Sequence, residues 1–276
     1  MTVAASTRMA GWLPALVLCV GCAARTASGP VDRGLAQLGR CDTAAARQEL
    51  TRALAAETDP SHEAAVAALV TKVDVVEGLR QYAGLLREAR RDADAAAIEE
   101  GARKICQAAG ETPTSAALGF DPTEQLRVYA AVLRERSREV EARETEAVAG
   151  AYEYDNVAHF LRGLTPPGRP AKGVVGATPG ESWYLVLTTR ASVRPDEELW
   201  KVYLSGVRDA PGPEQQVFAL FLLEVDCRPG RYRPVRRTDY DASGRVMAES
   251  RSDAGFREAK PGSVVERVVQ GGCKRQ

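Results

Sequence analysis

The chain has 276 residues, and its 37 lysines and arginines balance its 37 aspartates and glutamates, so the formal net charge is zero. Hydrophobic residues make up 45% of the chain and charged residues 27%, a composition that excludes a mainly disordered protein. A balanced charge gives no general argument for nucleic acid as a partner. The chain has only two histidines, His62 and His159, which leaves little basis for a metal site or for histidine-dependent catalysis.

The first 22 residues have the pattern of a targeting segment. Arg8 supplies a positive charge, and an apolar stretch over residues 11–20 follows it. About ten apolar residues are too few to span a bilayer of about 30 Å as a helix, but they match the apolar region of a signal peptide. The stretch ends in Val20-Gly21-Cys22, which resembles a bacterial lipobox, where the cysteine is acylated and becomes the first residue of the mature chain.

We therefore expect a signal peptide over residues 1–21, a lipidated tether over 22–30, and a membrane anchor at Cys22. Ala23 is not acidic, whereas lipoproteins retained in the inner membrane often carry an acidic residue at that position. The resemblance thus implies a lipid-anchored protein of the bacterial cell envelope, at the outer membrane. The alternative is ordinary secretion with cleavage near Ala23-Ala24, which would leave Cys22 without a role.

Residues 31–162 are rich in alanine and have a helical periodicity. Asp59-Pro60 and Asp121-Pro122 each place a capping carboxylate before a proline, which is typical of a helix start. The pattern predicts helices over residues 31–38, 43–57, 60–91, 93–109, 122–149 and 156–162.

One stretch of this half, residues 39–60, resembles the second half of a tetratricopeptide unit. Ala46, Ala53 and Leu54 have the spacing of that motif. No second copy follows convincingly at a period of about 34 residues, so the sequence favours a plain helical bundle over a repeat array.

The composition changes sharply after residue 162. Residues 163–180 hold five glycines and four prolines, which opposes both a helix and a central strand and predicts a linker. Short β-branched or aromatic runs then follow at residues 183–189, 199–204, 217–225, 232–238 and 245–249.

Turn and capping residues organise this second half. Gly230 and Gly244 each suit a left-handed position in a turn between two of the short runs. Ser263 and Glu266 form a capping box before a last, valine-rich helix that Gly271 should end. The sequence thus predicts an α+β protein, with a helical domain over 31–162 and a small antiparallel sheet with one C-terminal helix over 181–276.

Four cysteines remain once Cys19 is assigned to the leader and Cys22 to the anchor. They are Cys41, Cys106, Cys227 and Cys273. None lies in a CxxC pair or beside a histidine cluster, so structural disulfides formed in an oxidising compartment are favoured over zinc binding.

The second half carries, in order, the motifs Asp226-Cys227, Tyr232-Arg233, Tyr240-Asp-Ala-Ser-Gly244, Pro261-Gly-Ser263 and a final Cys273. Together they resemble the surface-adhesin protein E family of bacterial lipoproteins, over about residues 181–276. The resemblance implies a small antiparallel sheet, a C-terminal helix, and a disulfide between the two cysteines of these motifs. Cys41 and Cys106 should then pair within the helical half, if helix packing brings their Cα atoms within about 7 Å.

The sequence offers no catalytic motif, because no GxSxG, HExxH or P-loop pattern occurs in it. We therefore expect a protein that is not an enzyme, with no cofactor and no metal.

The one concentration of chemistry is basic, and it consists of Arg228, Arg231, Arg233, Arg236 and Arg237. In a regular strand Arg231, Arg233 and Arg237 share one face, and Tyr232 and Arg236 lie on the other. Such a face could bind sulfated glycans, lipopolysaccharide phosphates or acidic protein surfaces through arginine. The alternative, which the sequence favours, is a solvated face that prevents the sheet from pairing with other sheets.

Two functions of different class are consistent with this pattern. In the first, the chain is a surface-displayed, non-catalytic binding module whose partners are envelope proteins, host proteins or polyanionic glycans, and not nucleic acid. In the second, it is a periplasm-facing structural lipoprotein whose helical half scaffolds an envelope complex.

Overall fold

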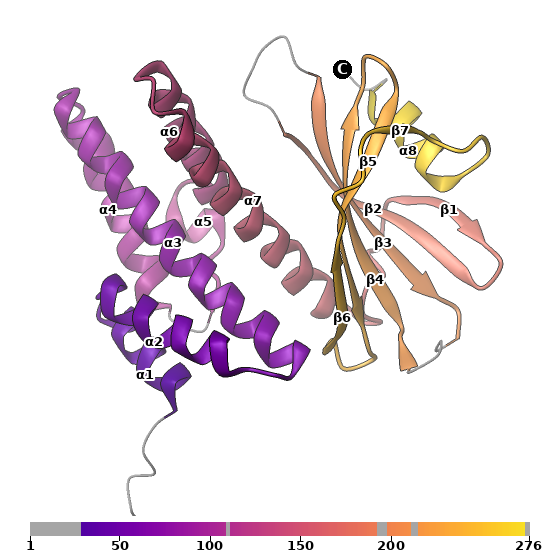
Figure 1. Ribbon diagram of the computed structural model, residues 1–276, viewed down its shortest axis with the longest axis horizontal. Helices are drawn as coiled ribbons and strands as arrows, with labels where there is room; N and C mark the ends of the chain where they lie inside the picture. Colours follow the sequence, from indigo (N-terminus) through magenta and orange to yellow (C-terminus); the bar gives the residue numbers. More distant parts are fainter. Residues whose placement is uncertain (1–28, 109–110, 192–197, 211–214, 274–276) are drawn as a thin grey trace, which may run out of the picture.

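The computed structural model describes residues 29–108, 111–191, 198–210 and 215–273. A group of helices built from the first part of the chain lies beside one antiparallel sheet, and a single helix covers the other face of that sheet (Figure 1). The α+β class expected from the sequence is confirmed. Among the described helices, none is both long enough and apolar enough to cross a membrane.

Seven helices precede the sheet in the described residues. They are α1 (Pro30–Gly39), α2 (Thr43–Ala56), α3 (Pro60–Glu88), α4 (Asp92–Gln107), α5 (Ser115–Leu118), α6 (Pro122–Glu135) and α7 (Glu139–Arg162). Both predicted helix starts are confirmed, because Asp59 accepts hydrogen bonds from the backbone N–H groups of Ser61 and His62, and Asp121 accepts one from Thr123.

Pairs of these helices form antiparallel hairpins, α1–α2, α3–α4 and α6–α7, that share one turn geometry (Figure 1). Cys41, Arg90 and Ser137 each take a left-handed conformation, with φ of 58°, 60° and 60°. In each turn the next N–H donates to a carbonyl of the last helical turn: Asp42 to Gln37, Arg91 to Leu86 and Arg138 to Leu133. This is the Schellman arrangement, which satisfies carbonyls at a helix end.

The second helix of each hairpin has a buried alanine as its fourth residue. Ala46, Ala95 and Ala142 each lie five residues after the left-handed residue, and each is fully buried. A second buried alanine follows seven residues later in each case, at Ala53, Ala102 and Ala149. The described helices therefore contain one helical hairpin three times, at a spacing longer than the one expected for a tetratricopeptide array.

One helix prediction was wrong. A single helix was expected over residues 122–149, but α6 ends at Glu135 and α7 runs without a break from Glu139 to Arg162. The left-handed Ser137 turns the chain back, and Arg134 of α6 then pairs with Glu146 of α7. This ion pair joins the two antiparallel helices.

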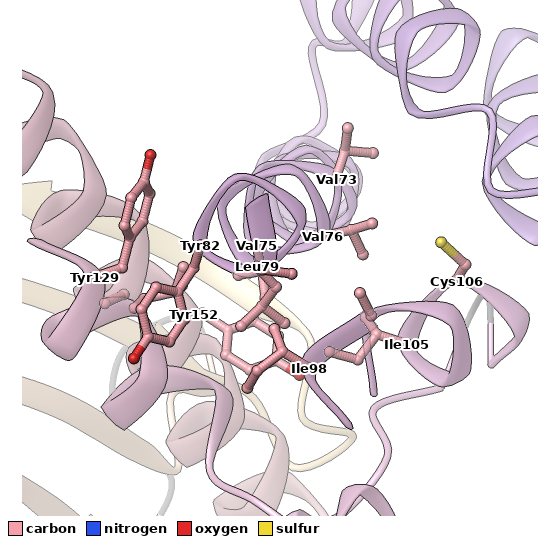
Figure 2. Packing of buried hydrophobic residues seen from close by; sticks show 14 of the residues in the cluster. Val73, Val75, Val76, Leu79, Tyr82, Ile98, Ile105, Cys106, Tyr129 and Tyr152 are labelled. Carbon is pink, nitrogen blue, oxygen red and sulfur yellow. The ribbon is translucent and has the colours of Figure 1, made fainter. Parts of the chain in front are cut away.

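The helical core is centred on α3, which contacts α2, α4, α6 and α7. Figure 2 shows the cluster, in which Leu79 and Tyr82 of α3 lie among Ile98, Tyr129 and Tyr152 from three other helices. The rings of Tyr82 and Tyr129 are 5.7 Å apart between centroids, which is an ordinary aromatic contact.

The sheet is an antiparallel meander in the order β1-β2-β3-β4-β5-β6, and a short β7 pairs with β5. Its elements are β1 (Val174–Thr178), β2 (Glu181–Arg190), β3 (Leu199–Arg208), β4 (Phe218–Asp226), β5 (Arg231–Tyr240), β6 (Val246–Arg251), β7 (Arg257–Glu258) and the final helix α8 (Val264–Cys273). The predicted linker over 163–180 is shorter than expected, because β1 lies inside it and pairs with β2. The predicted helix stop at Gly271 was also wrong, since α8 continues to Cys273.

The two faces of the sheet bury different partners. Tyr154 and Leu161 of α7 pack against Phe218, Leu220 and other residues of one face. The valines of α8 (Val264, Val268 and Val269) pack against the opposite face, on Val202, Leu204 and Leu223. The sheet therefore packs directly against the helical part through α7, and is not connected to it by the linker alone.

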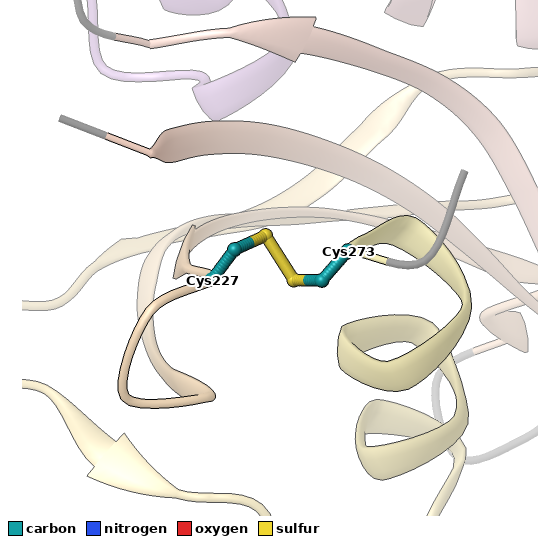
Figure 3. Close-up of a disulfide and its surroundings, with 2 residues drawn as sticks. All are labelled: Cys227 and Cys273. Atoms are coloured by element: carbon teal, nitrogen blue, oxygen red, sulfur yellow. A yellow bond between two sulfur atoms is a disulfide. The ribbon is translucent and has the colours of Figure 1, made fainter. Parts of the chain in front are cut away.

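A disulfide links Cys227, just after β4, to Cys273 at the end of α8 (Figure 3). The Cα atoms of this pair are 5.4 Å apart, within the usual range. This pairing was expected from the family resemblance. The disulfide fastens α8 to the sheet that it covers.

The predicted bridge between Cys41 and Cys106 is not formed, and both residues are free thiols. The Cys41 thiol lies 3.9 Å from the backbone carbonyl of Arg103, to which it donates. Burial, together with a hydrogen bond with Cys41, raises the pKa of the Cys106 thiol to about 12. The Cys106 thiol therefore stays protonated inside the helical core and is not an activated nucleophile.

Candidate functional site

A large cavity lies between the helical part and the sheet. It has a volume of about 840 Å³, and α6, α7, β2 and the start of β3 line it. Cavities that hold small molecules commonly measure about 300–1,000 Å³, so this one is large enough for a ligand.

The polar end of the cavity is built around Glu153 of α7, a side chain that is only 8% exposed. Nη2 of Arg127 donates to both carboxylate oxygens, at 3.1 and 3.0 Å. The hydroxyls of Tyr203 and Thr189 donate to Oε2, at 2.7 and 3.2 Å. Three side chains from α6, β2 and β3 therefore hold this carboxylate, and its charge is largely satisfied within the protein.

Lys201 enters the same end of the cavity from β3. A Cβ at position 150 of α7 would lie 2.6 Å from its Nζ, so the glycine found there lets the ammonium approach the helix backbone closely. Lys201 has no hydrogen bond or ion pair with the described residues. Burial lowers the pKa of this lysine, the Glu153 charge opposes that shift, and the Arg127 charge adds to it.

Toward its other end, the α7 and β2 walls of the cavity are largely apolar, whereas the start of α6 contributes the polar residues Asp121, Thr123 and Glu124. Val157, Val186 and Leu187 line the cavity there and belong to the buried cluster between α7 and the sheet. Val128 and Phe160 also line it and keep 37% and 53% of their surface exposed. Phe160 is therefore a large apolar side chain that the folded protein leaves open to solvent beside a cavity, which is a mark of a binding surface.

Two further features of the wall are polar. Glu146 faces the cavity, but Arg134 of α6 already binds it through both oxygens. Trp200 of β3 also lines the cavity, but its side chain packs with the cluster under α8, on the opposite face of the sheet from Lys201. Its buried indole N–H has no hydrogen-bond partner among the described residues.

The structure does not bring the five predicted arginines together as one surface. Arg233 pairs with Glu224 of the neighbouring strand at 2.6 Å, and Arg237 pairs with Asp239 at 2.9 Å. Arg228 and Arg231 are exposed, and neither forms an ion pair with the residues that the structure describes.

Arg236 is the most deeply buried of the five and belongs to the interface with α7. Its guanidinium lies 3.9 Å from the ring centre of Tyr154 and pairs with Glu249 at 2.6 Å. Asp155 of α7 is 3.9 Å away, and burial raises the pKa of that carboxyl to about 6. Arg236 therefore fastens the sheet to the helices and is not offered to an external polyanion.

The expected arrangement of arginines on one face was wrong because the strand does not alternate regularly. The register of β4 with β5 shifts between Leu222 and Leu223. Before the shift Tyr232 packs on the α8 side, so Arg231 and Arg233 lie on the α7 side. After it Arg237 stacks over Phe221, which also lies on the α8 side. A bulge of this kind places every later side chain of the strand on the face of the sheet opposite to the one that regular alternation predicts.

Sequence reasoning missed Glu153 and Lys201. Each is a lone charge in an otherwise apolar or aromatic run, Ala-Tyr-Glu-Tyr for the first and Leu-Trp-Lys-Val-Tyr for the second. A single charge in such a run is a signal of a buried, partnered group, because buried charges are rare unless they are paired.

No family model, curated protein or solved structure matches the chain. Among the described residues no group of three or more histidine, cysteine, aspartate or glutamate side chains could hold a metal ion.

Proposed function

We propose that this protein is a non-catalytic binding protein of the bacterial cell envelope, anchored by lipid at Cys22. Its binding site is the cavity between α7 and the sheet. The observation that carries this proposal is a cavity of about 840 Å³ whose wall combines exposed apolar side chains with a few fixed polar groups. That combination is typical of sites for small molecules.

The arrangement of the titratable groups supports binding rather than catalysis. The carboxylate of Glu153 is held by three donor side chains of the protein, which supports a structural role for it rather than the role of a general base. Neither free cysteine lines the cavity.

The cavity is favoured over the arginine-rich turn as the binding site. Three of the five arginines form ion pairs within the protein, and the turn offers only Arg228 and Arg231 without such a pair among the described residues. The surface-adhesin E resemblance of residues 181–276 supports a role in the envelope, but the sheet face that packs on α7 belongs to this chain's own helical part.

The proposed membrane location is tested by removing the cysteine that would carry the lipid. Cys22→Ala should move the protein from the membrane fraction to the soluble fraction and abolish incorporation of labelled palmitate, because the acyl chains provide the membrane affinity. Ser28→Ala serves as the control and should leave both unchanged. A Cys22→Ala protein that stays in the membrane fraction, beside a wild type that takes up no palmitate, would contradict the lipid anchor.

Binding in the cavity is tested with a bulky substitution in its wall. Ala131 of α6 lines the cavity, so Ala131→Trp should fill part of it and reduce the binding of Nile red, an uncharged fluorescent probe, by about tenfold or more. Ala97→Trp on the exposed surface of α4 is the matched control and should bind the probe like the wild type. Equal binding by both variants would show that the probe, if bound at all, does not occupy this cavity.

A further inference from the structure

The charges at the polar end of the cavity leave one cation without a partner among the described residues. Glu153 is bound by Arg127, and Glu146 is bound by Arg134, which also pairs with Glu139, so both carboxylates of the cavity already have a guanidinium partner. The remaining charge is the ammonium of Lys201, which has no ion pair with any described residue. A buried cation of this kind is stabilised when an anion enters the site.

The ammonium of Lys201 is a hydrogen-bond donor with three N–H groups. It has no acceptor among the described residues, although it lies on the same side of the sheet as Glu153. Tyr203 and Thr189 already donate to Glu153 and hold that carboxylate in place. The uncommitted charged group at this end is therefore a donor, which suits an acceptor such as a carboxylate.

Besides Glu146 and Glu153, which are bound by arginines, the wall carries two acidic residues that lie away from this end. Asp121 and Glu124 stand at the amino end of α6, with Asp121 fixed by its capping bond to the N–H of Thr123. Arg127 lies one helical turn beyond Glu124, on the side of Glu153. An anionic group would be repelled from the start of α6 and attracted to Lys201, so the cavity favours one orientation of a charged ligand.

Away from Lys201 the α7 and β2 walls of the cavity become largely apolar toward Phe160, whereas the start of α6 contributes polar residues. Along α7 the lining changes from Glu146, Glu153 and Asn156 to Val157 and Phe160. Along β2 it changes in the same direction, from Thr189 to Leu187 and Val186. Both walls therefore pass from polar to apolar together, and a ligand that matches them is charged at one end and apolar along the rest.

We propose that the cavity binds an amphipathic monoanion, such as a medium-chain carboxylate, with its carboxylate at Lys201 and its apolar chain along Val157, Leu187 and Phe160. The proposal rests on the proposed function, because it names the ligand class of that same cavity. It adds the charge and the orientation of the ligand.

The test compares decanoate with decanol, which share one chain length and differ in the charged end. Wild-type protein should bind decanoate more tightly than decanol, and Lys201→Met should weaken decanoate binding by about tenfold or more while leaving decanol binding within about twofold. Lys172→Met removes a lysine on the exposed segment before β1 and should change neither. Titration calorimetry measures all of these affinities.

Binding of Nile red shows in parallel whether the cavity of Lys201→Met is intact. If that variant still binds Nile red and its affinity for decanoate equals that of the wild type, the inference about the anion is overturned while the proposed binding function stands. Equal wild-type affinity for decanoate and decanol overturns it as well. If Nile red binding is insensitive to Ala131→Trp, the proposed function fails, and this inference fails with it.

Discussion

Loss of the disulfide between Cys227 and Cys273 should lower the free energy of unfolding by about 4 kcal/mol. The sequence separation of the two cysteines is 46 residues, and cross-linking a loop of that length removes about this much chain entropy from the unfolded state. The total stability of a domain is about 5–15 kcal/mol, so the loss is a large share of it. Urea unfolding of Cys227→Ser/Cys273→Ser against the wild type measures the difference.

Cys41→Ala provides the control for that experiment. It also removes a sulfur, but this cysteine is a free thiol and its loss breaks no cross-link. We expect it to cost less than about 1 kcal/mol, because only a weak thiol hydrogen bond and partly buried packing are lost. A double serine variant that unfolds at the same urea concentration as Cys41→Ala would show that the disulfide does not stabilise the sheet.

Gly168→Ala should destabilise the protein by about 2–5 kcal/mol, through two separate effects. Gly168 has φ of +75°, a conformation that costs an L-residue about 1–2 kcal/mol. A Cβ there would also overlap the side chain of Phe218, which is fully buried, and overpacking of this kind costs about 1–3 kcal/mol. Gly168 is fixed further by its carbonyl, which accepts a 2.6 Å hydrogen bond from the Ser205 hydroxyl.

Gly180→Ala separates the two effects. Gly180 has nearly the same φ, +79°, but nothing among the described residues lies within 4 Å of its would-be Cβ. It should therefore lose only the conformational part, about 1–2 kcal/mol, in the same urea unfolding experiment. If both variants lose the same free energy of unfolding, the segment after α7 does not pack against Phe218. The direct packing of the helical part on the sheet would then be contradicted.

The regular elements followed from the sequence because their signals are local. The caps at Asp59 and Asp121, the glycine turns at Gly230 and Gly244, and the capping residue Ser263 each act within a few residues, and each lies where it was predicted. The boundary between α6 and α7 was missed because its left-handed residue is Ser137, which carries no glycine signal.

The site could not be predicted, because long-range packing creates it. Arg127, Glu153 and Tyr203 are far apart in the chain, and only the seating of α7 on the sheet brings them into contact. The prediction of one arginine surface was wrong for a related reason. Partners for Arg236 come from α7 and β6, and one register shift in β5 moved Arg237 to the other face. Neither feature can be inferred by counting charges in a local stretch of sequence.

Binding of a ligand in the cavity between α7 and the sheet is tested most directly by methyl NMR during a titration with decanoate. The methyl signals of Val128, Val157 and Leu187, which line the cavity, should shift with increasing ligand. Those of Val264 and Val268, buried under α8 on the other face, should stay unchanged. Shifts confined to the α8 valines, or no shift in the cavity methyls at saturating decanoate, would contradict binding in this cavity.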